Sequence, residues 1–396
     1  MSQVEPGGDI SSARMRRALI AALALTLLVA GAAPAAAAGA VTWVVRGAGY
    51  GHGVGLSAYG AYGYGLHGFG YRQILHHYFQ GIRIAELPRA PLVRVLLTVS
   101  SGDVSFTRAT AACGQELDPA RTYTAHRNGS SVRLLSSSGK LLARCGDRLH
   151  ADSAGMIRIE GVGVYRGALE TVPSGSALNV VNALNVDNYA RGSVPGEVPP
   201  EWPMATLKTF AVAARSIALS TDVGGDGFDL YPDTRTQIYG GVALESERTD
   251  RAVAATRNQV ATYGGEVAQT TYFSSSGGRT ESGFLGAPEV PYLRSVPDPY
   301  DYYSPQHRWT FRFSQAEMDA RLGAYVRGRL RDLTVTRRGD SPRIDYARLL
   351  GTGGASTIRG DTLAAALGLY DRWAFFTKVR SGDSGERLAA ADLKER

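Results

Sequence analysis

Cysteine is scarce in this chain of 396 residues, and several common functional motifs are missing. Two cysteines without paired histidines at ligand spacing make a poor zinc site, so we expect no metal and no other cofactor. The glycine-rich stretch 47–55 fits no G-x-G-x-x-G register, and no Gly-Lys-Ser/Thr sequence occurs, which argues against a nucleotide-binding loop. A serine hydrolase built on residues 274–276 with His52 or His307 is disfavoured, because no Gly-x-Ser-x-Gly elbow is present.

The only long hydrophobic run lies within the first forty residues, and none follows it in the sequence. Three arginines precede an apolar run at residues 18–30, and four alanines follow at 35–38. This order is typical of a secretory signal peptide, which we expect to span residues 1–38, with an uncleaved membrane anchor as the alternative. We therefore expect a secreted or extracytoplasmic protein that touches a membrane only through this segment, if at all.

Export also determines how the cysteines and the charge are interpreted. Disulfides persist in oxidising compartments, so Cys113 and Cys145 are predicted to form one disulfide bond. The formal net charge of +7 favours an anionic wall polymer or lipid headgroup as partner over nucleic acid.

The rest of the chain mixes short alternating strands with a few helices, which indicates a β-rich α+β fold. Strands are expected at residues 92–97, 131–135, 178–184, 236–241, 259–263, 267–273 and 373–378, and helices at residues 203–219, 250–257 and 360–367. The expected domains are a signal peptide (1–38), a Gly/Tyr/His-rich segment packing on the core (39–90), a main domain with a β-rich insertion (91–310), a part completing the fold (311–380) and a polar tail (381–396).

One carboxylate stands out because prolines restrict the backbone around it. Glu197 lies within residues 193–203, which contain four prolines and Trp202. Proline fixes its own φ and disfavours helical geometry in the preceding residue, so we predict a rigid turn that presents Glu197. A general acid needs restricted geometry and a nearby apolar wall that raises its pKa. A solvated surface glutamate is the alternative.

The helix predicted after this turn carries two cations. Lys208 and Arg215 are seven residues apart, which places them on one face at a separation of about 10 Å. We expect this face to look toward Glu197, while two ordinary surface cations remain the alternative.

The glycine-rich N-terminal segment is a second candidate region. Its glycines surround His52, Ser57 and Tyr59, and a glycine cluster lets the backbone approach another surface closely. His52 is a candidate substrate contact, and a buried structural histidine is an equally weighted alternative.

These motifs resemble the stage II sporulation protein D family, also called the amidase-enhancer or LytB-type family, which acts on bacterial peptidoglycan. The resemblance covers about residues 92–310. The matching motifs lie in the family's order at residues 178–182, 187–189, 194–199, 202–203, 208, 211–215, 237–241, 274–280 and 291–293. Residues 49–61 are similar to a motif that usually closes such proteins, but here they come first.

The resemblance implies a lytic transglycosylase that cleaves glycan strands lacking stem peptides. Glu197 would be its catalytic residue, and Arg215 would bind the sugar or stabilise the negative charge of Glu197. One carboxylate suffices in this chemistry, because an internal alcohol displaces the leaving sugar, although Asp187 or Glu201 could act as a partner acid. The implied substrate-binding residues are Lys208, Gln237, Tyr239, Ser275, Ser276, His52 and Trp202.

Two further points follow from the resemblance. Some relatives bind metal through cysteines and histidines in an insertion that this chain lacks, and Thr236 replaces a cysteine often found before the Gln237 motif, so zinc is not expected. The family's older name implies the alternative function, a non-catalytic peptidoglycan-binding protein that activates a separate N-acetylmuramoyl-L-alanine amidase.

Overall fold

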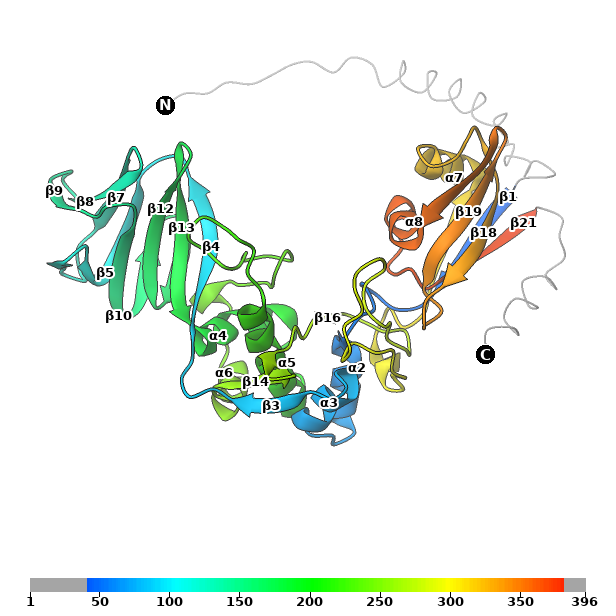
Figure 1. Cartoon of the computed structure of the whole chain (residues 1–396), viewed down its shortest axis with the longest axis horizontal. Coiled ribbons are helices and arrows are strands. Elements are labelled where there is room, and N and C mark those ends of the chain that lie inside the picture. The colour runs from blue at the N-terminus through cyan, green and yellow to red at the C-terminus, as the bar shows by residue number, and fades with distance from the viewer. Residues whose placement is uncertain (1–40, 381–396) are drawn as a thin grey trace, which may run out of the picture.

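The computed structural model describes residues 41–380, which form two β-rich lobes with helices between and below them (Figure 1). Sheets and helices alternate irregularly along the chain, so the predicted α+β class is confirmed. The expected signal peptide, 1–38, and the expected polar tail, 381–396, lie outside the described residues. Within 41–380, no helix combines the length and apolar character needed to cross a membrane.

The first lobe is a large, mainly antiparallel sheet that contains the predicted β-rich region. Its strand order is β4 (Leu92–Ser100), β13 (Ala177–Asn185), β12 (Ala168–Ser174), β10 (Leu149–Ile159), β5 (Val104–Ala112), β7 (Tyr123–Asn128), β8 (Ser131–Ser136) and β9 (Leu141–Arg144), with β11 (Gly163–Arg166) on β10 and β6 (Gln115–Glu116) on β5. Alternating apolar side chains such as Phe106, Leu134 and Val180 form its core. Cys113 and Cys145 are bonded to each other, as predicted.

The helical layer positions the candidate site. It contains α2 (Ala58–Leu66), α3 (Tyr71–Tyr78), α4 (Val186–Glu197), α5 (Met204–Ser220) and α6 (Glu247–Ala255), next to a small sheet of β3 (Arg83–Glu86), β14 (Gln259–Tyr263) and β15 (Glu266–Val267). The side chain of Asn185 caps α4 by accepting the Asn188 N–H. Helix α5 is the centre of this layer, because most of its side chains are buried against the other helices and β14.

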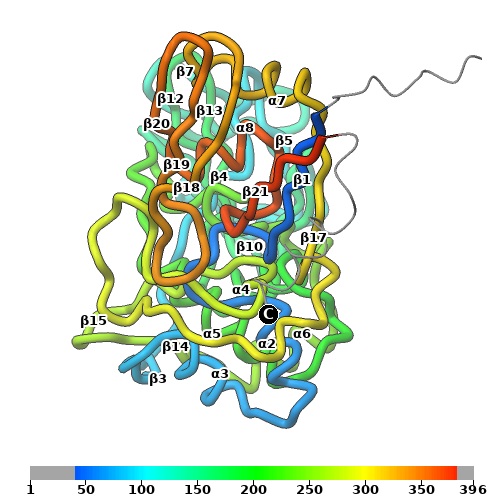
Figure 2. The backbone as a smooth tube through the Cα atoms, turned by 90° about the vertical axis from the view of Figure 1, so that its right-hand side faces the viewer, coloured from blue at the N-terminus to red at the C-terminus, as the bar shows by residue number. Residues whose placement is uncertain are grey.

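The second lobe joins the two ends of the described chain. Strand β1 (Val41–Gly47) lies between β17 (Trp309–Ser314) and β21 (Ala374–Arg380), and Figure 2 shows β1 and β21 running side by side. The lobe is completed by β18 (Leu330–Arg338), β19 (Ile344–Gly351), β20 (Gly354–Arg359), α7 (Gln315–Leu322) and α8 (Gly360–Leu367).

The glycine-rich segment packs on the core, as expected. Strand β2 (Leu56–Ser57) pairs in parallel with β16 (Tyr272–Phe273), and helices α2 and α3 contact α5. Two short 3-10 helices, η1 (Gly241–Ala243) and η2 (Asp301–Tyr303), complete the secondary structure. The segment thus contributes to both the helical layer and the second lobe.

Two local predictions are wrong, and the strand expected at residues 267–273 is present only at its ends, in β15 and β16. Glu197 ends helix α4 and does not lie in a turn: Pro195 removes one backbone hydrogen bond inside the helix, but the helix continues past it, and the Val198 N–H still reaches the Val194 carbonyl. Residues 236–241 form no strand, since their backbone N–H groups bond to scattered partners: Tyr239 to Pro232, and Ile238 to a side chain.

Candidate functional site

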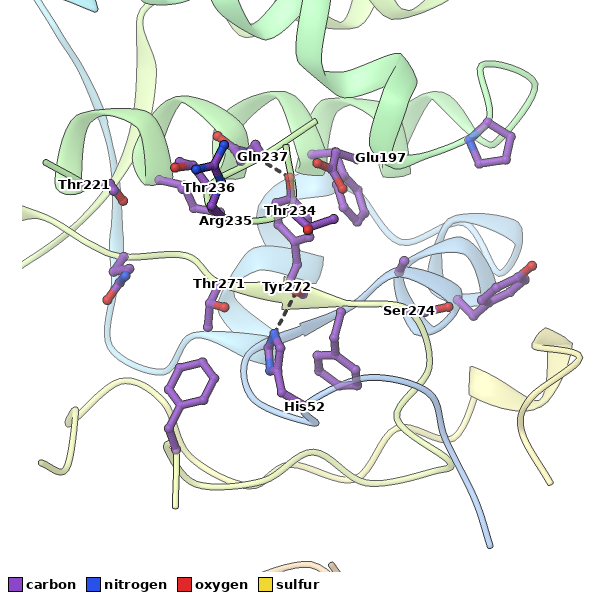
Figure 3. Close-up of a pocket in the computed structure, with 18 of the residues that line it drawn as sticks. His52, Glu197, Thr221, Thr234, Arg235, Thr236, Gln237, Thr271, Tyr272 and Ser274 are labelled. Carbon is purple, nitrogen blue, oxygen red and sulfur yellow. Dashed lines mark hydrogen bonds between the residues drawn. The ribbon is translucent and has the colours of Figure 1, made fainter. Parts of the chain in front are cut away.

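A pocket of about 610 Å3 lies where helix α5, strand β16 and the glycine-rich segment meet (Figure 3). Its apolar wall includes Trp202, Phe210, Phe273 and Phe284, and polar groups come from the loop 234–237 and from β16. Among the lining residues that the structure describes, Glu197 carries the only carboxyl group. An apolar pocket with a few convergent polar groups is the usual form of a small-molecule site.

The carboxyl group of Glu197 is held at the pocket wall by two donors. Its Oε1 accepts the backbone N–H of Ile238 at 2.7 Å, and the hydroxyl of Tyr272 is a second donor. Burial nevertheless raises the pKa of Glu197 above its usual value, because loss of solvent outweighs these two hydrogen bonds. The result is a fixed carboxyl group that keeps its proton to a higher pH than a surface glutamate does.

A chain of three side chains orients the Tyr272 hydroxyl. Tyr189 donates to Oε1 of Gln237 at 3.0 Å, and Nε2 of Gln237 donates to the Tyr272 hydroxyl at 2.8 Å. Because this hydroxyl already accepts a hydrogen bond from the amide, its own proton is available to Glu197. Burial raises the pKa of Tyr272 well above its usual value, so the hydroxyl stays protonated. Gln237 therefore lines the pocket and orients the Tyr272 hydroxyl.

His52 lines the opposite side of the pocket, and backbone groups use both of its ring nitrogens. Figure 3 shows Tyr272 between His52 and Glu197. Nδ1 accepts the Val54 N–H at 3.1 Å, so Nε2 carries the proton and donates to the Tyr272 carbonyl at 3.0 Å. Burial lowers the pKa of His52 to about 4, which keeps the ring neutral at physiological pH. His52 thus positions strand β16 and is not a proton donor to substrate.

Arg215 does not reach the pocket, contrary to expectation. Its side chain is fully buried, with Nε bonded to Asp187, Nη2 to the Val253 carbonyl, and Nη1 to Ala211 and Thr256. These contacts tie α5 to α4 and α6. The guanidinium and the Asp187 carboxylate are therefore both engaged in the helical layer, and neither residue lines the pocket.

The two predicted cations of α5 contact different neighbours, and neither lines the pocket. Lys208 approaches the ring of Tyr71, 6.0 Å from its centroid, on the α3 side of the helix. Residues two apart on a helix point about 200° apart, so Phe210 and Ile217 occupy the opposite face and line the pocket. Glu201, the other alternative acid, is exposed and lies outside the pocket lining.

Three other predicted contacts are buried outside the pocket lining. Tyr239 donates its hydroxyl to Asn182 at 2.6 Å and stacks on Tyr189. Ser275 and Ser276 are fully buried, and their hydroxyls bond to the carboxylates of Asp301 and Asp298, respectively. These serines therefore shape the loop that follows β16.

The same loop bears on the serine-hydrolase alternative. His307 and Ser275 both bond to the carboxylate of Asp301, at 2.9 and 2.8 Å. A nucleophilic serine must instead bond to the histidine, which then bonds to the acid. This arrangement does not form a catalytic triad.

Several lining residues were not predicted as site residues, and Tyr272 is the most important. It lies in a segment whose strand character is visible in the sequence, but the strand predicts only that its side chain points to one face. Arg235 and Phe284 are not predicted either, because they lie on loops that approach α4 and α5 only in the folded chain, while Ser274 enters the sequence analysis only through the 274–280 motif and the serine-hydrolase alternative. Within residues 41–380, no group of three or more His, Cys, Asp or Glu side chains could hold a metal ion.

Comparison with known proteins confirms the family resemblance. Residues 174–263 match the family model for stage II sporulation protein. This stretch contains Glu197 and Gln237 but ends before Tyr272, so segments outside the matched region complete the pocket.

Individual relatives support the same assignment. The chain is 28% identical over 239 residues to stage II sporulation protein D of Bacillus subtilis (strain 168), which covers 56% of this chain and 65% of that protein. It is 36% identical over 133 residues to the amidase enhancer of the same organism, covering 33% of this chain and 18% of that protein. An uncharacterised protein of Brachyspira hyodysenteriae is 36% identical over 137 residues, covering 33% of this chain and 37% of that protein. The chain therefore spans less than two thirds of the length of these relatives.

Proposed function

We propose that this protein is a secreted lytic transglycosylase that cleaves peptidoglycan glycan strands lacking stem peptides. The observation that carries the proposal is the Glu197 carboxyl group, which faces an apolar pocket with a raised pKa and two fixed hydrogen-bond donors. The confirmed family resemblance supplies the substrate class. In this proposal the substrate is a glycan strand of the cell wall, and no cofactor takes part.

Glu197 acts twice in the proposed reaction. Its protonated carboxyl group donates a proton to the glycosidic oxygen as the bond to C1 of the muramyl sugar breaks. The resulting carboxylate then takes the proton of the C6 hydroxyl of the same sugar while that oxygen attacks C1. The products are a fragment with a new non-reducing end, where the protonated glycosidic oxygen has become a free hydroxyl, and a fragment that ends in a 1,6-anhydro-muramyl sugar, and Glu197 regains its proton.

The surroundings of Glu197 suit this cycle. The carboxylate that forms after the first proton transfer is stabilised by the Ile238 N–H and the Tyr272 hydroxyl, which remain in place throughout. A hydrolase needs a second carboxylate to activate water or attack the sugar, and in the described pocket lining Glu197 stands alone. An intramolecular nucleophile removes that need.

A second function is supported by the similarity to the amidase enhancer. In that case the protein binds peptidoglycan without cleaving it and activates a separate cell-wall amidase. The pocket would then be a glycan-binding site, and the charge state of Glu197 would matter little. The two functions differ in whether a covalent product forms.

Product analysis distinguishes the two functions. The mature protein is incubated with denuded glycan strands, and 1,6-anhydro-muramyl ends are sought by mass spectrometry. The proposal expects these ends from the wild type and their absence with Glu197→Gln, which keeps the size and the acceptor oxygen of the side chain. Absence of product from the wild type, or equal product from both proteins, refutes catalysis by Glu197. Stimulation of an amidase that survives Glu197→Gln supports the second function.

A further inference from the structure

A strip of aromatic side chains, two of them half-buried and two exposed, leads away from the pocket. We call it the aromatic strip and define it as Tyr59, Tyr62, Tyr302 and Tyr303. Tyr302 and Tyr303 are 51% and 38% exposed, and these two residues form most of the short helix η2. Neighbouring aromatic side chains that reach the surface are candidates for a binding site.

The aromatic strip is continuous with the pocket through Trp202. The Trp202 ring lies 5.2 Å from Tyr59 and 4.7 Å from Tyr62, measured between centroids, and both Trp202 and Tyr59 line the pocket. Tyr62 then contacts Tyr303 edge-on at 5.6 Å, and Tyr303 lies 4.4 Å from Tyr302. A ligand in the pocket can therefore extend along an unbroken row of rings.

Buried contacts hold the aromatic strip in place. The fully buried Asp301 at the start of η2 accepts hydrogen bonds from Ser57, Ser275 and His307, as well as two backbone N–H groups. Helix α2 approaches η2 closely at Gly63, where an added Cβ would lie only 2.4 Å from the Tyr300 carbonyl oxygen. Gly63 thus lets α2 approach the start of η2 closely, while Tyr59 and Tyr62, three residues apart, lie on one side of the helix.

We propose that the aromatic strip is an extended binding site for the same glycan strand, with sugar rings stacked on its tyrosines beyond the pocket. The inference rests on the proposed function, which places a glycan at Glu197. A cavity of about 610 Å3 encloses only a short piece of a polymer, so the strand must leave the pocket over neighbouring surface. The face of a pyranose ring is lined by C–H groups, and it covers an aromatic face without displacing the sugar hydroxyls from water.

Preorganisation explains why this surface suits a flexible polymer. Rings already fixed by Asp301, by Gly63 and by one another lose little conformational entropy when a sugar binds. Stacking on the aromatic strip does not discriminate strongly between one sugar and another. Each further sugar that stacks on the strip increases the affinity for the strand. The expected signature is a dependence of affinity on strand length.

The test measures binding separately from cleavage. Calorimetry in the Glu197→Gln background compares the affinity for denuded glycan fragments of increasing length. We expect long fragments to bind more tightly than short ones, and we expect Tyr302→Ala combined with Tyr303→Ala to weaken long-fragment binding about tenfold while leaving short-fragment binding unchanged. The paired Phe substitutions keep the rings and should keep the affinity. Tyr325→Ala, at a tyrosine of similar exposure in the second lobe, serves as the matched control.

Each outcome bears on the proposal separately from the proposed activity. Loss of length dependence in the Ala variant supports the aromatic strip even if the wild type makes no anhydro product. Unchanged long-fragment binding in a folded Ala variant overturns it, even if the wild type cleaves glycan. An Ala variant that binds long fragments normally but no longer stimulates an amidase identifies the surface as a protein-docking site, which also overturns it.

Discussion

Replacing Arg215 by alanine tests whether this arginine acts in the site or in the core. The substitution removes the nearer of two cations around Asp187, since Arg257 lies 3.9 Å from the same carboxylate. It also leaves the Val253 and Ala211 carbonyls without the guanidinium that they bond. Removing one member of a buried ion pair costs about 3–5 kcal/mol. The side chain of Asp187 is 15% exposed, which favours the lower end, about 3 kcal/mol. That is a large part of the roughly 5–15 kcal/mol by which domains are stable.

Urea unfolding followed by circular dichroism measures this loss. Asp187→Asn, alone and combined with Arg215→Ala, completes a double-mutant cycle, and we expect a coupling of about 1–3 kcal/mol between the two side chains. Arg235→Ala is the matched control, because this arginine lines the pocket, is 58% exposed and should leave stability unchanged. Activity per folded molecule should be retained in Arg215→Ala. A variant with wild-type stability and no activity would refute the structural role.

Three further predictions concern other parts of the molecule. Glu197→Gln should gain stability relative to wild type as pH rises from acid to neutral, because the raised pKa of Glu197 means that ionisation destabilises the folded state; urea midpoints at several pH values check this. His52, with its pKa lowered to about 4, should stay neutral in ring NMR spectra down to pH 5, and stability should fall as pH drops from 6.5 toward 4. Replacing Cys113 and Cys145 by serine should cost about 3–4 kcal/mol in the first lobe, measured by thermal unfolding, and leave cleavage per folded molecule intact.

The sequence predicts the individual helices and strands of this fold better than it predicts which of them pack or pair with one another. The helix expected at residues 203–219 is found as Met204–Ser220, and the one at 360–367 is found as Gly360–Leu367. Periodicity identifies such elements because the pattern is contained within them. The pairing of β1 with β17 and β21 joins residues more than 260 positions apart, and nothing in a local pattern reports it.

The site residues show the same difference between what a local pattern contains and what depends on contacts in the folded chain. Glu197, Trp202 and Gln237 were identified from motifs, and all three line the pocket. Arg215 matched a motif equally well, but its position on the buried side of α5 depends on which helix face meets α4 and α6. A motif shows which residues matter to the family without showing whether they contact substrate or hold the core together.

The position of the glycine-rich segment explains how His52 can support the site without taking part in the proposed reaction. Strand β1 pairs with a strand on each side in the second lobe, which fixes the start of the loop that leads to the pocket. His52 then holds the Tyr272 carbonyl, and the other end of Tyr272 donates to Glu197. The neutral state of His52 is necessary for this arrangement, because Nδ1 must remain an acceptor for the Val54 N–H. The geometry of the proposed catalytic acid therefore depends on a segment more than 130 residues earlier in the chain, which acts through the backbone of a single tyrosine.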